Sequence, residues 1–261
     1  TESVVMINGI NGTQIFEPPF FGESRIQIVN DLEERLKSTM PPSIVCFWGD
    51  AGIGKTRLVQ ELFSRLQGML FDLYECKLQQ GHTPQKEIER FLLEHGYIQE
   101  GQYVDFVSMI ENCRTPFGNQ AVIFLDDFHN ADDSFLCEIQ SLKSNLSSIT
   151  LLISGRTDFT IGNINYLSFV QWANENLPES CFNVEPLTDD EAKNLIRVLI
   201  DGIPPYALDC LFNLSAKNPL FIVQYVEYLL DCSLVKIQNR NTVGIIDINK
   251  FHVKRFMPTQ I

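Results

Sequence analysis

Two glycines, a lysine and a threonine lie at the spacing that a phosphate-binding loop requires. The pattern G-x-x-x-x-G-K-[ST] is matched by Gly49-Asp50-Ala51-Gly52-Ile53-Gly54-Lys55-Thr56. Glycines let backbone N–H groups curl around phosphate oxygens without a side chain in the way. We expect Lys55 to contact the β- and γ-phosphates of a nucleotide and the Thr56 hydroxyl to bind Mg²⁺. Arg57 follows directly and completes the predicted nucleotide-binding segment.

Two carboxylates at the end of an apolar run give a second chemical signal. Residues 121–125 are all apolar and lead directly into Asp126 and Asp127. In a parallel sheet, both carboxylates would lie at the carboxyl edge, beside the phosphate site. We expect Asp126 to hold Mg²⁺, usually through water, and Asp127 to orient and deprotonate the attacking water. The alternative is structural, since an aspartate in this stretch can cap the helix that opens near Asp132.

A guanidinium follows a third apolar run. Residues 149–154 lead into the polar tip Gly155-Arg156-Thr157. Arg156 is therefore a candidate sensor of the γ-phosphate, because a guanidinium pairs well with phosphate oxygens. The alternative for an arginine after a strand is a solvated surface residue.

The elements around these residues occur in the order that a P-loop requires. Residues 43–48 read as a strand buried on both faces, whereas residues 23–36 and 55–67 have helical periodicity. Further apolar runs alternate with helical patterns and lie at 71–76, 121–125, 149–154 and 181–184. These runs predict an α/β fold, a P-loop NTPase with a five-stranded parallel core sheet flanked by helices.

The pattern changes after Pro186. Three helical segments at 189–200, 204–216 and 219–232 predict a small all-helical lid, and residues 233–247 read as two short strands around Asn239-Arg240-Asn241. Residues 251–261 are expected to begin a further unit of a longer protein. The predicted domains are an N-terminal segment and helix at 1–42, the core at 43–186, the lid at 187–232, and the hairpin with the start of a following domain at 233–261.

Composition narrows the classes of partner and location. The net charge of −13 disfavours direct nucleic-acid binding, although Lys250, His252, Lys254 and Arg255 form a local basic cluster. No apolar run approaches the roughly 20 residues of a membrane span, so a cytoplasmic location is expected. The seven cysteines are scattered singly without a C-x-x-C pair, and we expect them to be reduced and mostly buried.

Several motifs together resemble a known family. They are Phe21-Gly22, the P-loop, the run 125–132, the tip 154–156, Pro186-Leu187-Thr188 and Asn218-Pro219-Leu220-Phe221. The chain resembles the signal-transduction ATPases with numerous domains (STAND) within the AAA-like P-loop proteins, as found in multidomain adenylyl cyclases, large transcription regulators and antiviral proteins. It departs from them in having Gly22-Glu23-Ser24 where Gly-Arg-Glu is usual, and Asn130 where tryptophan is common.

The resemblance implies further roles. Phe21 and Gly22 would contact the nucleotide, Pro219 would pack on the adenine, and a winged-helix-like unit would follow the hairpin. His129 is expected to be a packed residue rather than a catalytic base.

A slow ATPase switch is the function that the resemblance implies. ATP or ADP with Mg²⁺ would control self-assembly, and effector and sensor domains would lie outside this chain. Three alternatives stay open: an AAA-type DNA loader or remodeller, a small-molecule kinase, and a scaffold that binds nucleotide without hydrolysis.

Overall fold

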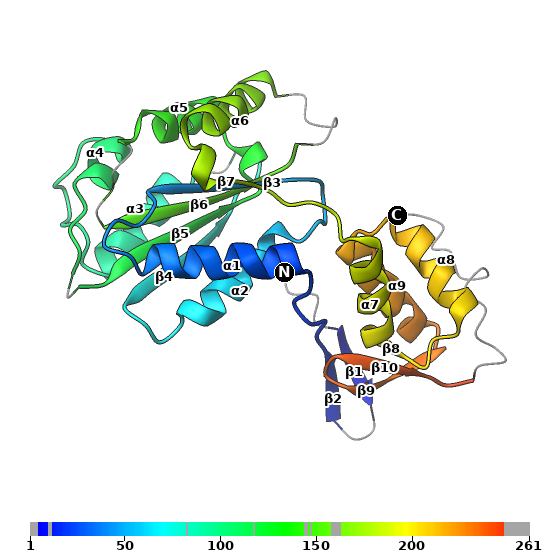
Figure 1. Ribbon diagram of the computed structural model, residues 1–261. Helices are drawn as coiled ribbons and strands as arrows, with labels where there is room; N and C mark the ends of the chain where they lie inside the picture. Colours follow the sequence, from blue (N-terminus) through cyan, green and yellow to red (C-terminus); the bar gives the residue numbers. More distant parts are fainter. Residues whose placement is uncertain are drawn as a thin grey trace. The chain divides into compact units, whose positions relative to one another are not determined.

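The computed structural model describes residues 5–9, 12–81, 83–116, 118–143, 146, 148–157 and 163–247 (Figure 1). The chain divides into two compact units. The sheet unit consists of Ser24–Ala51 and Lys55–Val184. The lid unit consists of Thr1–Glu23, Gly52–Gly54 and Glu185–Ile261.

A parallel sheet forms the centre of the sheet unit. Its five strands are β3 (Ile44–Trp48), β4 (Phe71–Lys77), β5 (Gln120–Asp126), β6 (Ile149–Gly155) and β7 (Cys181–Asn183). They are hydrogen-bonded in the order β4-β5-β6-β3-β7, and every neighbouring pair is parallel. Every residue of β3 and β6 is buried, which is why these strands read as unbroken apolar runs. The predicted five-stranded α/β core is confirmed.

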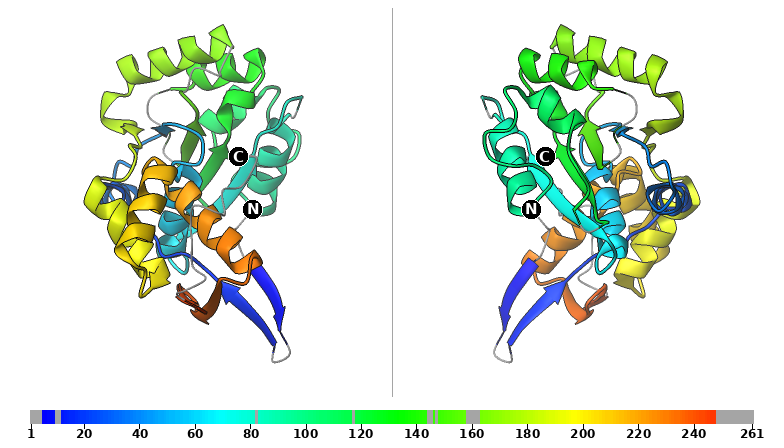
Figure 2. Two further views of the ribbon diagram at one scale, coloured as in Figure 1. Left: turned by 90° about the vertical axis from the view of Figure 1, so that its right-hand side faces the viewer. Right: turned by 90° about the vertical axis from the view of Figure 1, so that its left-hand side faces the viewer.

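Helices cover both faces of this sheet (Figures 1 and 2). One face carries α1 (Glu23–Leu36) and α2 (Lys55–Leu66), and Phe63 of α2 packs edge-to-face on Phe124. The other face is covered by α3 (Gln85–Glu94), α4 (Phe106–Glu111), α5 (Asp133–Ser141) and α6 (Ile164–Asn176). Short 3-10 turns precede α5 and β7, at Phe128–Asn130 and Pro178–Ser180.

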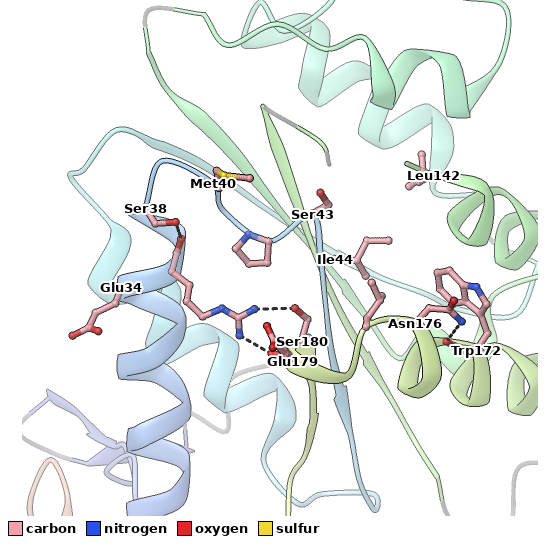
Figure 3. A pocket seen from close by; sticks show the side chains of 13 residues that line it. Glu34, Ser38, Met40, Ser43, Ile44, Leu142, Trp172, Asn176, Glu179 and Ser180 are labelled. Carbon is pink, nitrogen blue, oxygen red and sulfur yellow. Dashed lines mark hydrogen bonds between the residues drawn. The ribbon is translucent and has the colours of Figure 1, made fainter. Parts of the chain in front are cut away.

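A hollow of about 840 Å³ opens at the amino end of β3 (Figure 3). Its lining includes Trp172 and Asn176 of α6 and Ser43 before β3. The Arg35 guanidinium at its rim donates to the Glu179 carbonyl at 2.8 Å and to Ser180 Oγ at 2.9 Å. The hollow is separate from the phosphate loop, because β3 begins at one edge of the sheet and reaches the loop at the other.

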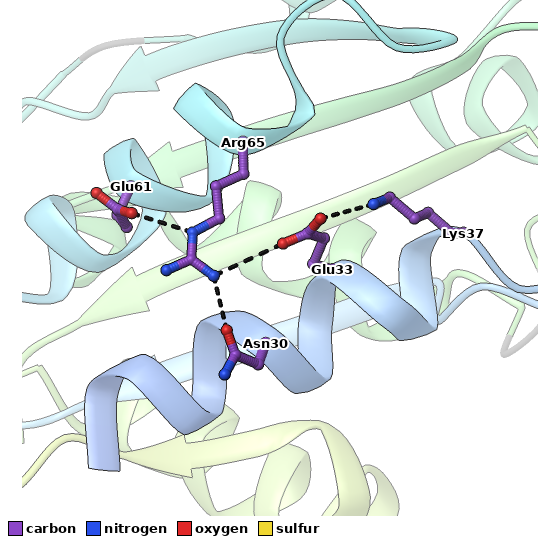
Figure 4. Close-up of polar contacts among 5 residues, drawn as sticks. All are labelled: Asn30, Glu33, Lys37, Glu61 and Arg65. Atoms are coloured by element: carbon purple, nitrogen blue, oxygen red, sulfur yellow. Dashed lines mark hydrogen bonds and ion pairs between the residues drawn. The ribbon is translucent and has the colours of Figure 1, made fainter. Parts of the chain in front are cut away.

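A polar network joins the two helices of the first face (Figure 4). Arg65 of α2 donates to Asn30 Oδ1 at 2.7 Å and pairs with Glu33 at 3.6 Å and Glu61 at 3.0 Å. A hydrogen bond from Lys37 holds the pKa of Glu33 below its ordinary value of 4.5. Because the folded-state pKa is depressed, the stabilisation from Glu33 is present above pH 4.5 and is lost as the pH falls further.

We expect Arg65→Ala to lower the free energy of unfolding by about 1 kcal/mol, because one partly buried guanidinium serves three partners on two helices. Urea unfolding measures this loss. Arg90→Ala is the matched control, since Arg90 is 70% exposed and pairs with Glu94, one turn away on the same helix, at 4.0 Å. Equal losses in the two variants would contradict a stabilising role for the network.

The lid unit combines three helices with a small sheet. The helices are α7 (Asp189–Leu199), α8 (Pro205–Ser215) and α9 (Pro219–Asp231), close to the predicted segments. Thr188 and Glu191 form a reciprocal capping box that starts α7. The expected hairpin is present as β9 (Val235–Asn239) and β10 (Thr242–Ile245).

Residues 187–232, predicted to be all helical, also contain one short strand. A two-residue strand, β8 (Ile200–Asp201), pairs in parallel with β10 and completes a three-stranded sheet in the order β8-β10-β9. Ile200 and Val243 are fully buried in the hydrophobic cluster of this unit. The helical periodicity of residues 189–200 conceals this strand, because Ile200 also completes the apolar face of α7.

An amino-terminal hairpin also belongs to the lid unit, and the sequence reading did not predict it. Strands β1 (Val5–Gly9) and β2 (Gly12–Phe16) pair antiparallel beside the β9–β10 ribbon (Figure 2). Glu17 N donates to the Arg240 carbonyl at 2.7 Å, and the two side chains form an ion pair. Phe16 is fully buried in the lid cluster.

Two expectations from the sequence fall outside what the structure describes. The start of a winged-helix-like unit at 251–261 and the basic cluster at 250–255 lie beyond residue 247. No helix in the described ranges is long and apolar enough to cross a bilayer. The cytoplasmic location and the domain boundaries stay predictions.

Candidate functional site

The phosphate loop connects the end of β3 to the start of α2. Gly52 and Gly54 adopt φ values of 70° and 103°, a region that L-residues with side chains rarely enter. A Cβ at Gly52 would also lie 2.6 Å from Cδ2 of Leu220, which belongs to the same compact unit. The first turn of α2 contains no acidic residue, so no carboxylate of that turn repels an anion at its N-terminus.

Lys55 is a buried cation folded back onto this loop. Its Nζ donates to the carbonyls of Gly49 and Asp50 at 2.8 Å each, and the residue is only 8% exposed. Burial lowers the pKa of the Lys55 ammonium, while the Asp126 carboxylate opposes that shift. A phosphate group would supply the negative charge that a buried ammonium lacks, so the loop fits a nucleotide phosphate.

Asp126 links the loop to the neighbouring strand. It ends β5, is 2% exposed and accepts a hydrogen bond from Thr56 Oγ1 at 2.9 Å on Oδ2. Its other oxygen, Oδ1, accepts from Ser154 Oγ of β6. The structure thus brings together the two predicted Mg²⁺ ligands, a hydroxyl and a carboxylate, which is an oxygen donor set that suits a hard cation.

Asp127 has a separate environment. Its backbone is left-handed, with φ 54° and ψ 41°, and its Oδ2 lies 3.2 Å from the Lys77 ammonium. It makes no side-chain capping bond, and α5 is instead capped by Asp132, which accepts from Phe135 N at 2.7 Å. The capping alternative therefore does not explain either member of the Asp126-Asp127 pair.

The predicted sensor arginine lies at the tip of β6. After burial, the Arg156 charge is a further cause that lowers the pKa of the Lys55 ammonium. The Arg156 carbonyl accepts a hydrogen bond from the Tyr166 hydroxyl at 2.9 Å. His129 packs edge-to-face against the same tyrosine ring.

The remaining predicted contacts are distributed over the two units. Arg57 is half-buried on α2, two residues after Lys55. Phe21 packs against the lid cluster, and Gly22 has a φ of 107°. Pro219 is the first residue of α9, directly after Asn218, whose side chain accepts from Leu220 N at 3.0 Å.

Comparisons with solved structures agree with this architecture. One is a Signal Transduction ATPase with Numerous Domains (STAND) protein with a tetratricopeptide repeat sensor from Pyrococcus horikoshii, with 20% identity and a TM-score of 0.52 over 81% of this chain and 31% of that one. The ADP form of ORC2 from Aeropyrum pernix has 12% identity and a TM-score of 0.49 over 80% and 62%. Drosophila ORC bound to DNA has 14% identity and a TM-score of 0.46 over 80% and 56%.

The chain has the fold of the AAA-type P-loop ATPases. The similarity extends to the fold alone, because no more than 20% of residues are identical in these three structures. The chain spans 31% of the STAND protein and 62% of ORC2. No protein-family model and no curated protein matches this sequence.

Two residues contact the acidic pair although the sequence predicted no role for them. Ser154, part of the tip 154–156 at the end of the third apolar run, donates to Asp126. Lys77 lies opposite Asp126 in the β4–β5 register and reaches Asp127. The missing information was strand order, since only neighbouring strands bring the end of β4 and the end of β6 to the acidic pair.

Proposed function

We propose that this chain is the ATP- and ADP-binding module of a larger signalling or defence protein, in which slow hydrolysis and nucleotide state control self-assembly and effector activation. The observation that supports it best is the chain of contacts from the loop to the acidic strand. Lys55 is folded on its own loop, and Thr56 contacts Asp126. Loop, cation and carboxylate thus occur together as nucleotide binding requires.

Each residue has a distinct role in this proposal. Lys55 and the loop N–H groups bind the β- and γ-phosphates, and Thr56 and Asp126 hold Mg²⁺. When bound, Mg²⁺ neutralises part of the phosphate charge. Asp127 orients the attacking water and accepts its proton, and Arg156 senses the γ-phosphate.

Slow turnover is expected because no arginine of this chain is assigned to neutralise the charge of the transition state. We assign Arg156 as a sensor, and we expect a neighbouring copy of the protein to supply the arginine that completes charge neutralisation in the transition state. Hydrolysis in the isolated chain would then be slow, and assembly would couple to nucleotide state. The fold similarity to a STAND protein with a sensor domain favours this switch. Pro219 against the adenine, and Phe21 and Gly22 near the nucleotide, complete the proposed contacts.

The second candidate is an AAA-type DNA loader or remodeller. Proteins of that class share a P-loop, an acidic strand and a helical lid, and this chain has all three features. The net charge of −13 favours the switch over direct nucleic-acid binding. Binding of a fluorescent DNA duplex at low salt distinguishes the two.

Nucleotide content and assembly test the switch. We expect the purified chain to retain an adenine nucleotide, which anion-exchange chromatography of the denatured protein identifies. Light scattering should show no assembly on addition of ATP, because the domains that assemble lie outside this chain. Guanine nucleotide, or none in any preparation, would count against the switch. A defined ATP-dependent ring of this chain alone would make the remodeller the better account.

A further inference from the structure

Two cysteines far apart in the sequence lie opposite each other in the central sheet. Cys46 is the middle residue of β3, Cys181 is the first residue of β7, and the two are aligned partners in the parallel register. Neighbouring strands lie about 4.8 Å apart, within the range of Cα separations that a disulfide spans. All seven cysteines are reduced thiols in this structure.

Aromatic packing on the opposite face fixes this alignment. Phe47 and Phe182, the next residues of the two strands, stack with ring centroids 5.9 Å apart and an interplanar angle of 20°. Because successive side chains point to opposite faces, this stack places both thiols together on the other face. The interaction between the two thiols raises the pKa of Cys46 and lowers that of Cys181.

The two thiols have different environments. Cys46 is fully buried, and burial raises the pKa of its thiol well above the ordinary value. Cys181 is half-buried on the short edge strand β7. Hydrogen bonds from Cys46 and from the Trp48 side chain lower the pKa of Cys181. Cys181 is thus the better nucleophile, and Cys46 is the second thiol, which can react with an oxidised Cys181.

We propose that Cys46 and Cys181 form a dithiol site that hydrogen peroxide converts to a reversible β3–β7 disulfide. This inference is independent of the nucleotide chemistry, because it rests on the register and side-chain contacts of two strands.

The oxidation proceeds in two balanced steps. The Cys181 thiolate attacks one peroxide oxygen, the O–O bond breaks, and the departing hydroxide takes a proton to leave as water. Cys181 is then a sulfenic acid. The Cys46 sulfur attacks the Cys181 sulfur, the S–O bond breaks, and the leaving hydroxide combines with the Cys46 proton as a second water. Peroxide is reduced, and two thiols are oxidised to one disulfide.

The disulfide would join two strands that lead into different parts of the chain. The strand β3 runs directly into the phosphate loop at Gly49, and β7 runs into Val184, whose N–H donates to the Trp48 carbonyl at 2.7 Å. The disulfide would lie two residues before Trp48 and would fix the edge strand to the strand that carries the loop. The site therefore offers covalent redox control next to the loop.

Peptide mapping of the intact chain after brief peroxide treatment tests the site. We expect the seven thiols to fall by two, with a Cys46–Cys181 cross-linked peptide that dithiothreitol removes. Cys181→Ser should abolish the cross-link. Cys137→Ser is the matched control, because Cys137 is exposed and is predicted to leave the cross-link intact. Cys181 lies on an edge strand, so its serine variant is expected to fold, which circular dichroism verifies.

Two results would overturn the proposal. One is oxidation of Cys181 to sulfinic acid with no cross-linked peptide in the folded protein. The other is a cross-link that forms as fast in urea as in the folded chain, since the proposal depends on the register of β3 and β7.

Discussion

Replacing Lys55 with alanine is expected to lower the affinity for ATP and ADP at least 100-fold, which corresponds to roughly 3 kcal/mol. Lys55 is 8% exposed, its ammonium donates to the Gly49 and Asp50 carbonyls, and residues 49–56 contain no other basic side chain. Within the loop, removal would leave only backbone N–H groups to bind the phosphate oxygens. Isothermal titration calorimetry with and without Mg²⁺ measures the loss.

Two controls separate binding from folding in this experiment. Lys37→Ala removes the same charge just after the end of α1, where Lys37 is 42% exposed and pairs with Glu33, and should leave affinity unchanged. Thermal unfolding of Lys55→Ala checks the fold, because its loss leaves the Gly49 and Asp50 carbonyls without their donor. Wild-type affinity in a folded Lys55→Ala protein would remove the basis of the proposed function.

The sequence predicted the sheet well because of how its strands are buried. β3 and β6 are buried at every residue, so each reads as an apolar run bounded by polar or glycine residues. The loop was predicted from the spacing of its residues. Few segments other than phosphate loops have the pattern G-x-x-x-x-G-K-[ST] between a strand and a helix. Local patterns were sufficient for both.

Local sequence patterns did not predict which distant segments pair. The order β4-β5-β6-β3-β7 differs from chain order, and it alone brings Lys77 and Ser154 to the acidic pair. The same limitation hid the Cys46–Cys181 alignment, because single cysteines read as isolated small hydrophobic residues. The expectation that most cysteines are buried was also wrong: three of the seven are buried, three are intermediate and Cys137 is exposed.

The amino-terminal hairpin was missed for a different reason. Asn8-Gly9 and Asn11-Gly12 are pairs typical of tight turns, yet the flanking residues do not alternate clearly between apolar and polar. Its docking depends on Phe16, which is buried among lid residues more than 170 positions away, such as Leu187 and Ile222. A single apolar residue at the end of a strand carries little sequence signal.

Asp127→Asn is expected to retain nucleotide and to lose hydrolysis by roughly 100- to 10,000-fold, the usual effect of removing a general base. Asparagine has nearly the same shape as aspartate. It also tolerates the left-handed backbone at this position (φ 54°), which is strained for most other residues. The fold and the phosphate loop should therefore be intact, while the amide cannot take a proton from water. Single-turnover phosphate release measures the chemical step, and calorimetry measures binding.

Asp126→Ala should behave differently, because Asp126 accepts from both Thr56 and Ser154 and lies where Mg²⁺ is expected. We expect it to weaken Mg²⁺-dependent binding while binding without Mg²⁺ changes less. The two variants thus divide the acidic pair into a metal-holding and a proton-accepting member. If both lost nucleotide binding to the same extent, the pair would be structural. If Asp127→Asn lost Mg²⁺ dependence and Asp126→Ala did not, the two assignments would be reversed.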